Sequence, residues 1–328
     1  MRYLVTGGAG YIGSHVVLAL LDAGHEVAVI DNFITGHRGA IPNGVELHDV
    51  DLLDYSATSN VFASGVWDGV LHFAALSLVG DSIKNPFHYL RNNYLSSLNL
   101  IQLCSQHKVE KFVFSSTAAL FGGPDRCEAI SETDPIQPAS PYGESKYMIE
   151  RILRWADKVH GLKSTCLRYF NAAGADPFNR AGEDHSPETH LIPLTIDAAL
   201  GKRPPLQLFG VDYPTPDGSC IRDYVHVTDI AEAHLRALEY LNDKSTAFNL
   251  GNGRGYSNLE VIQSVERVSG RRVPWEPAPR RLGDPAVLVA DSSKIKRETG
   301  WSPRFDNLDK IVETAFEWRE QHPNGYDK

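Results

Sequence analysis

The sequence predicts an α/β protein with a doubly wound parallel sheet, followed by a smaller C-terminal α/β domain. In the first half of the chain, short β-branched runs alternate with longer segments of helical periodicity, which is typical of βαβ units around a parallel sheet. A glycine-rich loop separates the first run from the first helical segment. Beyond residue 171 the local composition changes, with stretches rich in proline and glycine at 176–188, 203–218 and 274–285.

The first βαβ unit can be followed residue by residue. Tyr3–Thr6 forms the first expected strand, and residues 11–22 carry apolar side chains at helical spacing. Gly24 is placed to end that helix, and Glu26–Ile30 forms the second strand. Further strands are expected at Val45–His48, Val70–Phe73, Lys111–Ser115 and Thr165–Phe170.

These patterns divide the chain into two domains. Residues 1–171 form the predicted sheet domain, and residues 172–328 form mainly a second, ligand-binding domain. Val227–Leu241 has the pattern of a helix that could pack on the sheet. We therefore expect part of the segment 222–250 to return to the first domain.

Composition indicates a globular protein and argues against binding of nucleic acid. The chain has 328 residues, 42% of them hydrophobic, and this is enough for a large core. A net charge of −9 and a pI near 5.8 argue against a nucleic-acid partner. An anionic ligand would therefore be held by a few local groups, such as helix N-termini and individual arginines, and not by a broad basic surface.

The cysteines and the N-terminus indicate the compartment. The four cysteines show neither CxxC pairing nor metal-ligand spacing with histidine, so we expect reduced thiols and no metal: Cys104, Cys127, Cys166 and Cys220. The first strand begins at residue 3 and no apolar run reaches membrane-spanning length. We expect a cytoplasmic protein with no membrane partner.

The glycine loop at residues 7–13 predicts a dinucleotide site. Gly7 permits a tight turn, Gly10 lets the backbone approach a pyrophosphate, and Gly13 allows close packing of helix on strand. Asp31 ends the second strand, 18 residues after Gly13, where a carboxylate accepts hydrogen bonds from ribose hydroxyls and repels a 2′-phosphate. NAD is thus favoured over NADP. Asp51 is either a partner of the adenine amino group or a solvated loop acid.

Tyr142 and Lys146 form a YxxxK pair. Ser140 and Pro141 are suited to begin a helix, which puts the phenol and the ammonium on one helix face. A phenol with a pKa near 10 is a poor base, and a neighbouring ammonium together with the positive nicotinamide would lower that pKa. Thr117, at the end of a strand, is placed to share the proton.

The chain resembles the extended short-chain dehydrogenase/reductase superfamily and, within it, the UDP-glucose 4-epimerases. The stretches that carry the resemblance are VTGGAGYIGSH (5–15), HFAA (72–75), FSSTAALFG (114–122), SPYGESK (140–146), LRYFNAAGA (167–175), FGVDYPTPDGSCIRDYVHV (209–227) and APRRLGDP (278–285). They cover nearly the whole chain. The resemblance implies a Rossmann fold, a homodimer, and NAD-dependent interconversion of UDP-glucose and UDP-galactose through a transient 4-keto sugar.

The resemblance also implies roles for individual residues. Tyr142 is the acid/base, Lys146 binds the nicotinamide ribose, and Thr117 assists. The implied NAD-binding residues are Gly7, Gly10, Tyr11, Ile12, Gly13, Asp31, Asn32, Asp51, Leu52, Phe73, Ala74, Asn92, Ser115, Tyr142, Lys146 and Tyr169. The implied residues for the UDP-sugar are Thr117, Asn171, His190, Leu208, Arg222, Arg281 and Asp284.

Three positions depart from the best-known members of the family. Ser77 stands where a lysine often follows the strand that carries the HFAA motif. His190 stands where some members have asparagine, so a structural histidine is an alternative there. Leu288 occupies the position where a bulky tyrosine excludes N-acetylated sugars and a small residue admits them. Acceptance of UDP-GlcNAc, of pentoses or of uronates therefore stays open.

Two other functions compete with epimerisation. A nucleotide-sugar 4,6-dehydratase would carry Asp-Glu after the strand-end threonine, but here Ala118 and Ala119 follow Thr117. A non-catalytic NAD-binding regulator would not need Tyr142 and Lys146. Substitution of Tyr142 separates the second alternative from an enzyme.

Overall fold

The structure, a computed structural model, describes residues 1–122, 128–241, 244–281 and 284–326. The first part of the chain runs β1 (Arg2–Thr6), α1 (Tyr11–Asp22), β2 (Glu26–Asp31), η1 (Arg38–Ala40), β3 (Glu46–Asp49), α2 (Tyr55–Ala63), β4 (Gly69–His72), α3 (Val79–Lys84), α4 (Pro86–Gln106), β5 (Lys111–Thr117), η2 (Ala118–Leu120), α5 (Pro141–His160) and β6 (Lys163–Tyr169). The second part runs β7 (Asn171–Ala173), α6 (Leu191–Ala199), β8 (Leu206–Phe209), β9 (Ile221–His226), α7 (Val227–Tyr240), β10 (Thr246–Leu250), β11 (Gly255–Ser257), α8 (Asn258–Ser269), β12 (Trp275–Ala278), β13 (Val287–Leu288), α9 (Ser293–Thr299) and α10 (Leu308–Gln321).

A seven-stranded parallel sheet is the centre of the molecule. Its strand order is β10-β6-β5-β4-β1-β2-β3, and every neighbouring pair is parallel. The order reverses between β1 and β4, so a crevice opens at the carboxyl ends of these two strands. The predicted doubly wound sheet is confirmed.

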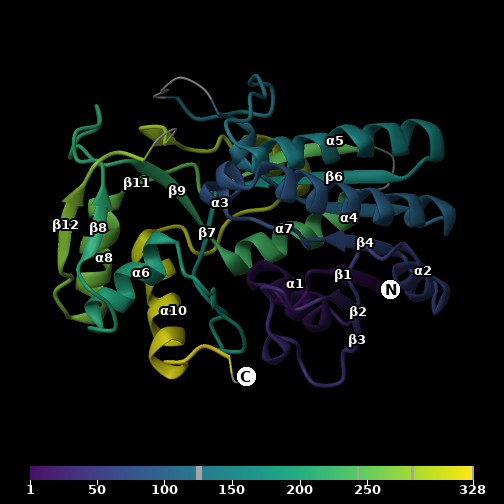
Figure 1. Ribbon diagram of the computed structural model, residues 1–328, viewed down its shortest axis with the longest axis horizontal. Coiled ribbons are helices and arrows are strands. Elements are labelled where there is room, and N and C mark those ends of the chain that lie inside the picture. Colours follow the sequence, from purple (N-terminus) through teal and green to yellow (C-terminus); the bar gives the residue numbers. More distant parts are fainter. Residues whose placement is uncertain (123–127, 242–243, 282–283, 327–328) are drawn as a thin grey trace.

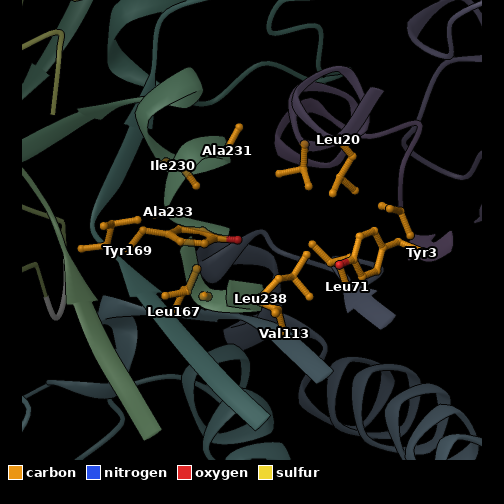
Figure 2. Close-up of a cluster of buried hydrophobic side chains, with 14 of the residues drawn as sticks. Tyr3, Leu20, Leu71, Val113, Leu167, Tyr169, Ile230, Ala231, Ala233 and Leu238 are labelled. Carbon is orange, nitrogen blue, oxygen red and sulfur yellow. The ribbon is translucent and has the colours of Figure 1, made fainter. Parts of the chain in front are cut away.

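Helices cover both faces of this sheet (Figure 1). Tyr3 and Val5 of β1 point into a core shared with α1 and α7, whereas Leu4 points into the opposite core, shared with α2, α4 and α5. Figure 2 shows the first core, where Leu20 of α1 and Leu238 of α7 approach Tyr3. The alternation follows from the two-residue period of a strand that is buried on both faces.

The start of α5 is fixed by its own sequence. The Ser140 hydroxyl accepts a hydrogen bond from the Gly143 backbone N–H at 3.1 Å, and Pro141 occupies the first turn. Gly161 ends the helix in the left-handed conformation. Residues 142 and 146 consequently lie in the first two turns, next to the end of β5.

The second lobe contains smaller sheets and its own core. Strand β9 pairs with β7, β11 and β13, β8 pairs with β12, and α6, α8 and α10 pack around them. The chain then comes back to the large sheet, because α7 packs against α1 and β10 pairs with β6. In the part of the chain that the structure describes, no helix combines the length and the apolarity that a bilayer span requires.

Candidate active site

A cavity of about 330 Å³ lies at the carboxyl edge of the large sheet, at the switch point between β1 and β4. All of the residues that we expected at the NAD site line it: Gly7, Gly10, Tyr11, Ile12, Gly13, Asp31, Asn32, Asp51, Leu52, Phe73, Ala74, Asn92, Ser115, Tyr142, Lys146 and Tyr169. From the set expected for the sugar nucleotide, Thr117, Asn171 and His190 also line the cavity.

The three glycines of the loop bring backbone, and no side chain, to the cavity. Gly7 has φ +71°, and a Cβ there would lie 2.5 Å from the backbone nitrogen of Ala74. A Cβ on Gly13 would lie 2.1 Å from the Gly7 carbonyl oxygen. Gly10 caps α1 without a side-chain hydrogen bond, so the first N–H groups of the helix remain available to an anion. The loop therefore has the form of a phosphate cradle.

Asp31 holds the glycine loop and keeps free capacity to accept hydrogen bonds. Its two carboxylate oxygens accept hydrogen bonds from the backbone N–H groups of Ala9 and Phe33, each at 2.9 Å. Burial raises its pKa, while these hydrogen bonds act in the opposite direction. Since each oxygen carries a second lone pair, Asp31 can hold the glycine loop and still accept from a ribose.

Tyr142 and Lys146 meet the end of β5 inside the cavity. The Lys146 ammonium is buried and donates a hydrogen bond to the Ser115 carbonyl at 2.8 Å. The Tyr142 phenol interacts with the Thr117 hydroxyl. Ser115 in turn hydrogen-bonds through its hydroxyl to the phenol of Tyr169. Side chains from α5, β5 and β6 thus converge on one wall.

Burial dominates the ionisation of this pair in the protein alone. Burial raises the pKa of Tyr142 to about 12, and the hydrogen bond with Thr117 only partly opposes this effect. Burial also lowers the pKa of Lys146 to about 7. The expected lowering of the tyrosine pKa was assigned to the lysine together with the positive nicotinamide of bound NAD, and in the protein alone desolvation dominates. A further positive charge is needed to favour the phenolate.

Buried polar contacts hold α5 in place. Glu150, two turns after Tyr142, receives hydrogen bonds from Arg168 of β6 at 2.9 and 2.6 Å and from the Ser116 hydroxyl at 2.7 Å. Asn93 of α4 donates to the Ser145 hydroxyl at 3.0 Å and also contacts the backbone of Leu76 at the cavity rim. These contacts fix the helix relative to the strand ends.

A second group of expected residues lies on the other lobe. Arg222 of β9 is mostly buried and contacts the Asp284 carboxylate at 2.6 Å. The guanidinium of Arg281 lies 4.1 Å from the centre of the Phe209 ring. None of these three site residues is among those that line the cavity. Leu208 is packed into the core of the second lobe.

Two of the departures from the family lie near these groups. Ser77 lines the cavity beside the end of β4. Leu288 pairs with Arg222 across β13 and β9, and packs against a cluster that contains Phe121 and Phe170. Phe170, which packs against the same cluster, also lines the cavity.

Sequence reasoning missed several residues of the cavity wall. Glu183 and His185 line it next to His190, and further members are Thr35, Gly36, Ala75, Leu76, Ser96, Phe170 and Ala172. A motif was present for the first group, because two glutamates and two histidines occur within residues 183–190. The group contains no cysteine, so a pattern of cysteines and histidines does not reveal it.

Comparison with known proteins identifies the family. The model of the NAD dependent epimerase/dehydratase family matches residues 3–251, which run from β1 through β10. The chain belongs to this family. A UDP-glucose 4-epimerase from Lacticaseibacillus casei is 49% identical over 99% of both chains. A crystal structure of a UDP-glucose 4-epimerase matches with a TM-score of 0.97 and 47% identity over all of both chains.

A further relative connects the family to the cofactor. The UDP-glucose 4-epimerase from Bifidobacterium longum, solved in complex with NAD+ and UDP, matches with a TM-score of 0.94 and 36% identity over 99% of this chain and 100% of that one. The glycine cradle and Asp31 of this chain fit the pyrophosphate and the ribose of a dinucleotide. The prediction of NAD as the cofactor is confirmed.

Proposed function

We infer that this protein interconverts UDP-glucose and UDP-galactose by inverting C4 of the hexose with NAD as the cofactor. The convergence of Tyr142, Thr117 and Lys146 on the wall of a dinucleotide cavity carries this inference. The full-length similarity to UDP-glucose 4-epimerases supports the same reaction. The predicted activity is thereby confirmed at the level of the reaction.

We assign the proton chemistry to Tyr142. Its phenolate accepts the proton from O4 of the hexose, and Thr117, which is hydrogen-bonded to the phenol, shares that proton. Bound NAD supplies the acceptor and donor for the C4 hydride, and its positive ring adds the charge that the phenolate requires. Lys146 stays on the Ser115 carbonyl, from which it can reach a ribose hydroxyl. Tyr142 returns the proton to O4 after the 4-keto sugar has rotated in the site.

The sugar nucleotide is anchored, in this proposal, by both lobes. Asn171 and His190 contact it from the cavity side, and Arg222 with Arg281 neutralises the pyrophosphate from the second lobe. Asp284 keeps the Arg222 guanidinium oriented through their 2.6 Å contact. Anchoring UDP while the hexose is free to turn is the requirement that inversion at C4 imposes.

A homodimer is part of the proposal. Leu95 of α4 and Trp155 and Val159 of α5 are 41%, 63% and 64% exposed, although all three are apolar. Trp155 and Val159 also line a hollow, together with Leu98, Ile101, Gln102, Ser105, Gln106, Ile152, Ala156 and His160. Packing this face against a second copy would bury the patch. Trp155→Glu should convert a dimer to a monomer in light scattering.

A cytoplasmic location is proposed from thiol chemistry. Cys104, Cys166 and Cys220 are free and buried in the structure, and this fits a reducing compartment. The fourth cysteine, Cys127, lies outside the described residues.

The reaction is tested with purified protein and UDP-galactose, with no NAD added. Formation of UDP-glucose, followed by NMR, is the expected result because the cofactor is restored in each cycle. Tyr142→Phe protein with the same NAD content serves as the control. If protein that carries NAD forms no UDP-glucose, the substrate assignment is wrong. The same assay with UDP-GalNAc decides whether Leu288 admits an N-acetyl group.

A further inference from the structure

Four side chains of the loop before α6 converge on one point. Glu183, His185, Glu188 and His190 each offer one ligand atom, and these four atoms lie within 4.8 Å of one another. The residues come from an E-x-H-x2-E-x-H sequence, and His190 is the N-cap residue of α6. Asp184, within the same motif, points elsewhere, because its carboxylate contacts His37 and the Tyr326 backbone.

The distances within this group resemble the edges of a coordination tetrahedron. The Glu183 Oε1 atom lies 3.2 Å from His185 Nδ1 and 2.8 Å from His190 Nδ1. The Glu188 carboxylate lies 3.5 Å from His185 Nδ1 and 2.9 Å from His190 Nδ1. Ligands at 2.0–2.1 Å from a tetrahedral zinc ion are separated by about 3.3–3.4 Å. The carboxylate-to-imidazole distances are close to this spacing, with Glu188 using Oε2 toward His185 and Oε1 toward His190.

The central atoms of the group lack proper hydrogen bonds. The Glu183 side chain is only 7% exposed, yet its Oε1 forms no hydrogen bond to any described residue. The buried Nδ1 of His185 also lacks such a hydrogen bond. A buried carboxylate oxygen left in this state is costly, and a cation at the common centre would satisfy it.

The Glu188 carboxylate is also oriented by hydrogen bonds from the backbone. Glu188 Oε1 accepts hydrogen bonds from the backbone N–H groups of Thr189 at 2.7 Å and of His190 at 2.8 Å. Its other oxygen faces His185. Ligating carboxylates are commonly oriented by such second hydrogen bonds.

We propose that Glu183, His185, Glu188 and His190 form a structural site for a divalent metal ion of the Zn²⁺ class. Two neutral imidazoles and two carboxylates carry a charge of −2, which one divalent ion neutralises. Four protein ligands leave no open position, so the ion is structural. The site goes beyond the epimerisation reaction and does not depend on it.

The site would act on the wall of the cavity. It ties residues 183–190 to the beginning of α6, and Glu183, His185 and His190 line the cavity. With Nδ1 of His190 bound to the metal, the proton of the ring resides on Nε2. His190 would then be fixed as a hydrogen-bond donor toward a ligand, in contrast to an ordinary histidine that can present either tautomer.

The test measures metal content and thermal stability of the full-length protein. The purified protein is treated with EDTA, dialysed against Zn²⁺ or Mg²⁺, and freed of excess metal. We expect about one zinc per chain by mass spectrometry and a melting temperature about 5 °C higher with Zn²⁺ than after EDTA, with no rise for Mg²⁺. Tetrahedral Co²⁺ absorption should appear when Co²⁺ replaces Zn²⁺.

Variants locate the ion. Glu188→Gln and His185→Gln should lose the bound zinc and the temperature shift. His48→Gln is the matched control, because His48 makes a similar 3.0 Å contact with Glu46 at a distant surface site. It should keep both. Wild-type protein that binds no zinc, or zinc that both cluster variants retain, would overturn the proposal and leave an ion-pair network. The wild-type comparison stands even if a variant does not fold.

Discussion

At the switch-point cavity, Asp31 and Lys146 are held by backbone groups, whereas on the second lobe Arg222 and Asp284 hold each other by their side chains. Asp31 is fixed by two backbone N–H groups and Lys146 by a strand carbonyl. Arg222 instead contacts the side chain of Asp284, 62 residues away in the sequence. The cofactor side is therefore organised by topology, while the geometry of the substrate side depends on pairs of charged side chains.

The largest expected effect tests the chemistry on the cofactor side. Tyr142→Phe removes the proton acceptor while leaving the glycine cradle intact, so turnover should fall by about 10³-fold with the NAD content unchanged. Turnover and NAD released on denaturation are both measured. Tyr147→Phe, on the same helix but not among the residues that line the cavity, is the control and should leave turnover nearly unchanged. Retained turnover in Tyr142→Phe would mean that another group is the base.

The next effect concerns the scaffold that holds α5. Glu150→Gln leaves the buried Arg168 without its charged partner and should lower the free energy of unfolding by about 3 kcal/mol. Chemical denaturation measures this change. Glu144→Gln, exposed on the same helix, should cost less than about 0.5 kcal/mol. Equal stabilities would show that the sheet alone positions the helix.

A weaker effect is expected on the substrate side. Arg222→Ala should raise the KM for UDP-galactose by about 10–100-fold through loss of a charge-assisted contact, with NAD retention unaffected. Steady-state kinetics separate KM from kcat. Arg236→Ala removes a surface pair with Glu232 and is the control. An unchanged KM in the Arg222 variant would show that Arg222 does not anchor the substrate from the second lobe.

The smallest effects compare the two acids near the adenosine. Asp31→Asn should weaken NAD retention by about tenfold, because one charge-assisted hydrogen bond to ribose is lost. Asp51→Asn should change retention less than about threefold if Asp51 is a solvated loop acid. Dialysis followed by measurement of bound NAD decides between its two roles. Equal losses in both variants would assign Asp51 to the adenine.

The same contrast explains what could be predicted from sequence. Gly7 follows β1, Gly13 lies in the first turn of α1 and Asp31 ends β2, and local spacing together with the parallel topology brings them to one edge. The start of α5 was predictable from Ser140 and Pro141 for the same local reason. The doubly wound sheet followed from the alternation of strand and helix patterns.

Long-range packing could not be predicted in this way. The pairing of Arg222 with Asp284 joins distant segments, and residues 282–283 of the same family motif lie outside the described part of the chain. Leu208 was expected at the ligand from family resemblance, yet it is packed in a core. The pKa of Tyr142 depends on how deeply α5 is buried, and a sequence motif does not report this.

The edge strand β10 has a consequence for how the molecule is made. Its residues, 246–250, complete a sheet whose other strands lie between residues 2 and 169. During synthesis, β6 therefore keeps an open edge until about 250 residues have left the ribosome, with the whole of β7 to α7 emerging in between. A fragment that stops at residue 171 would expose this edge permanently and should aggregate. The two lobes are thus expected to mature together, late in translation.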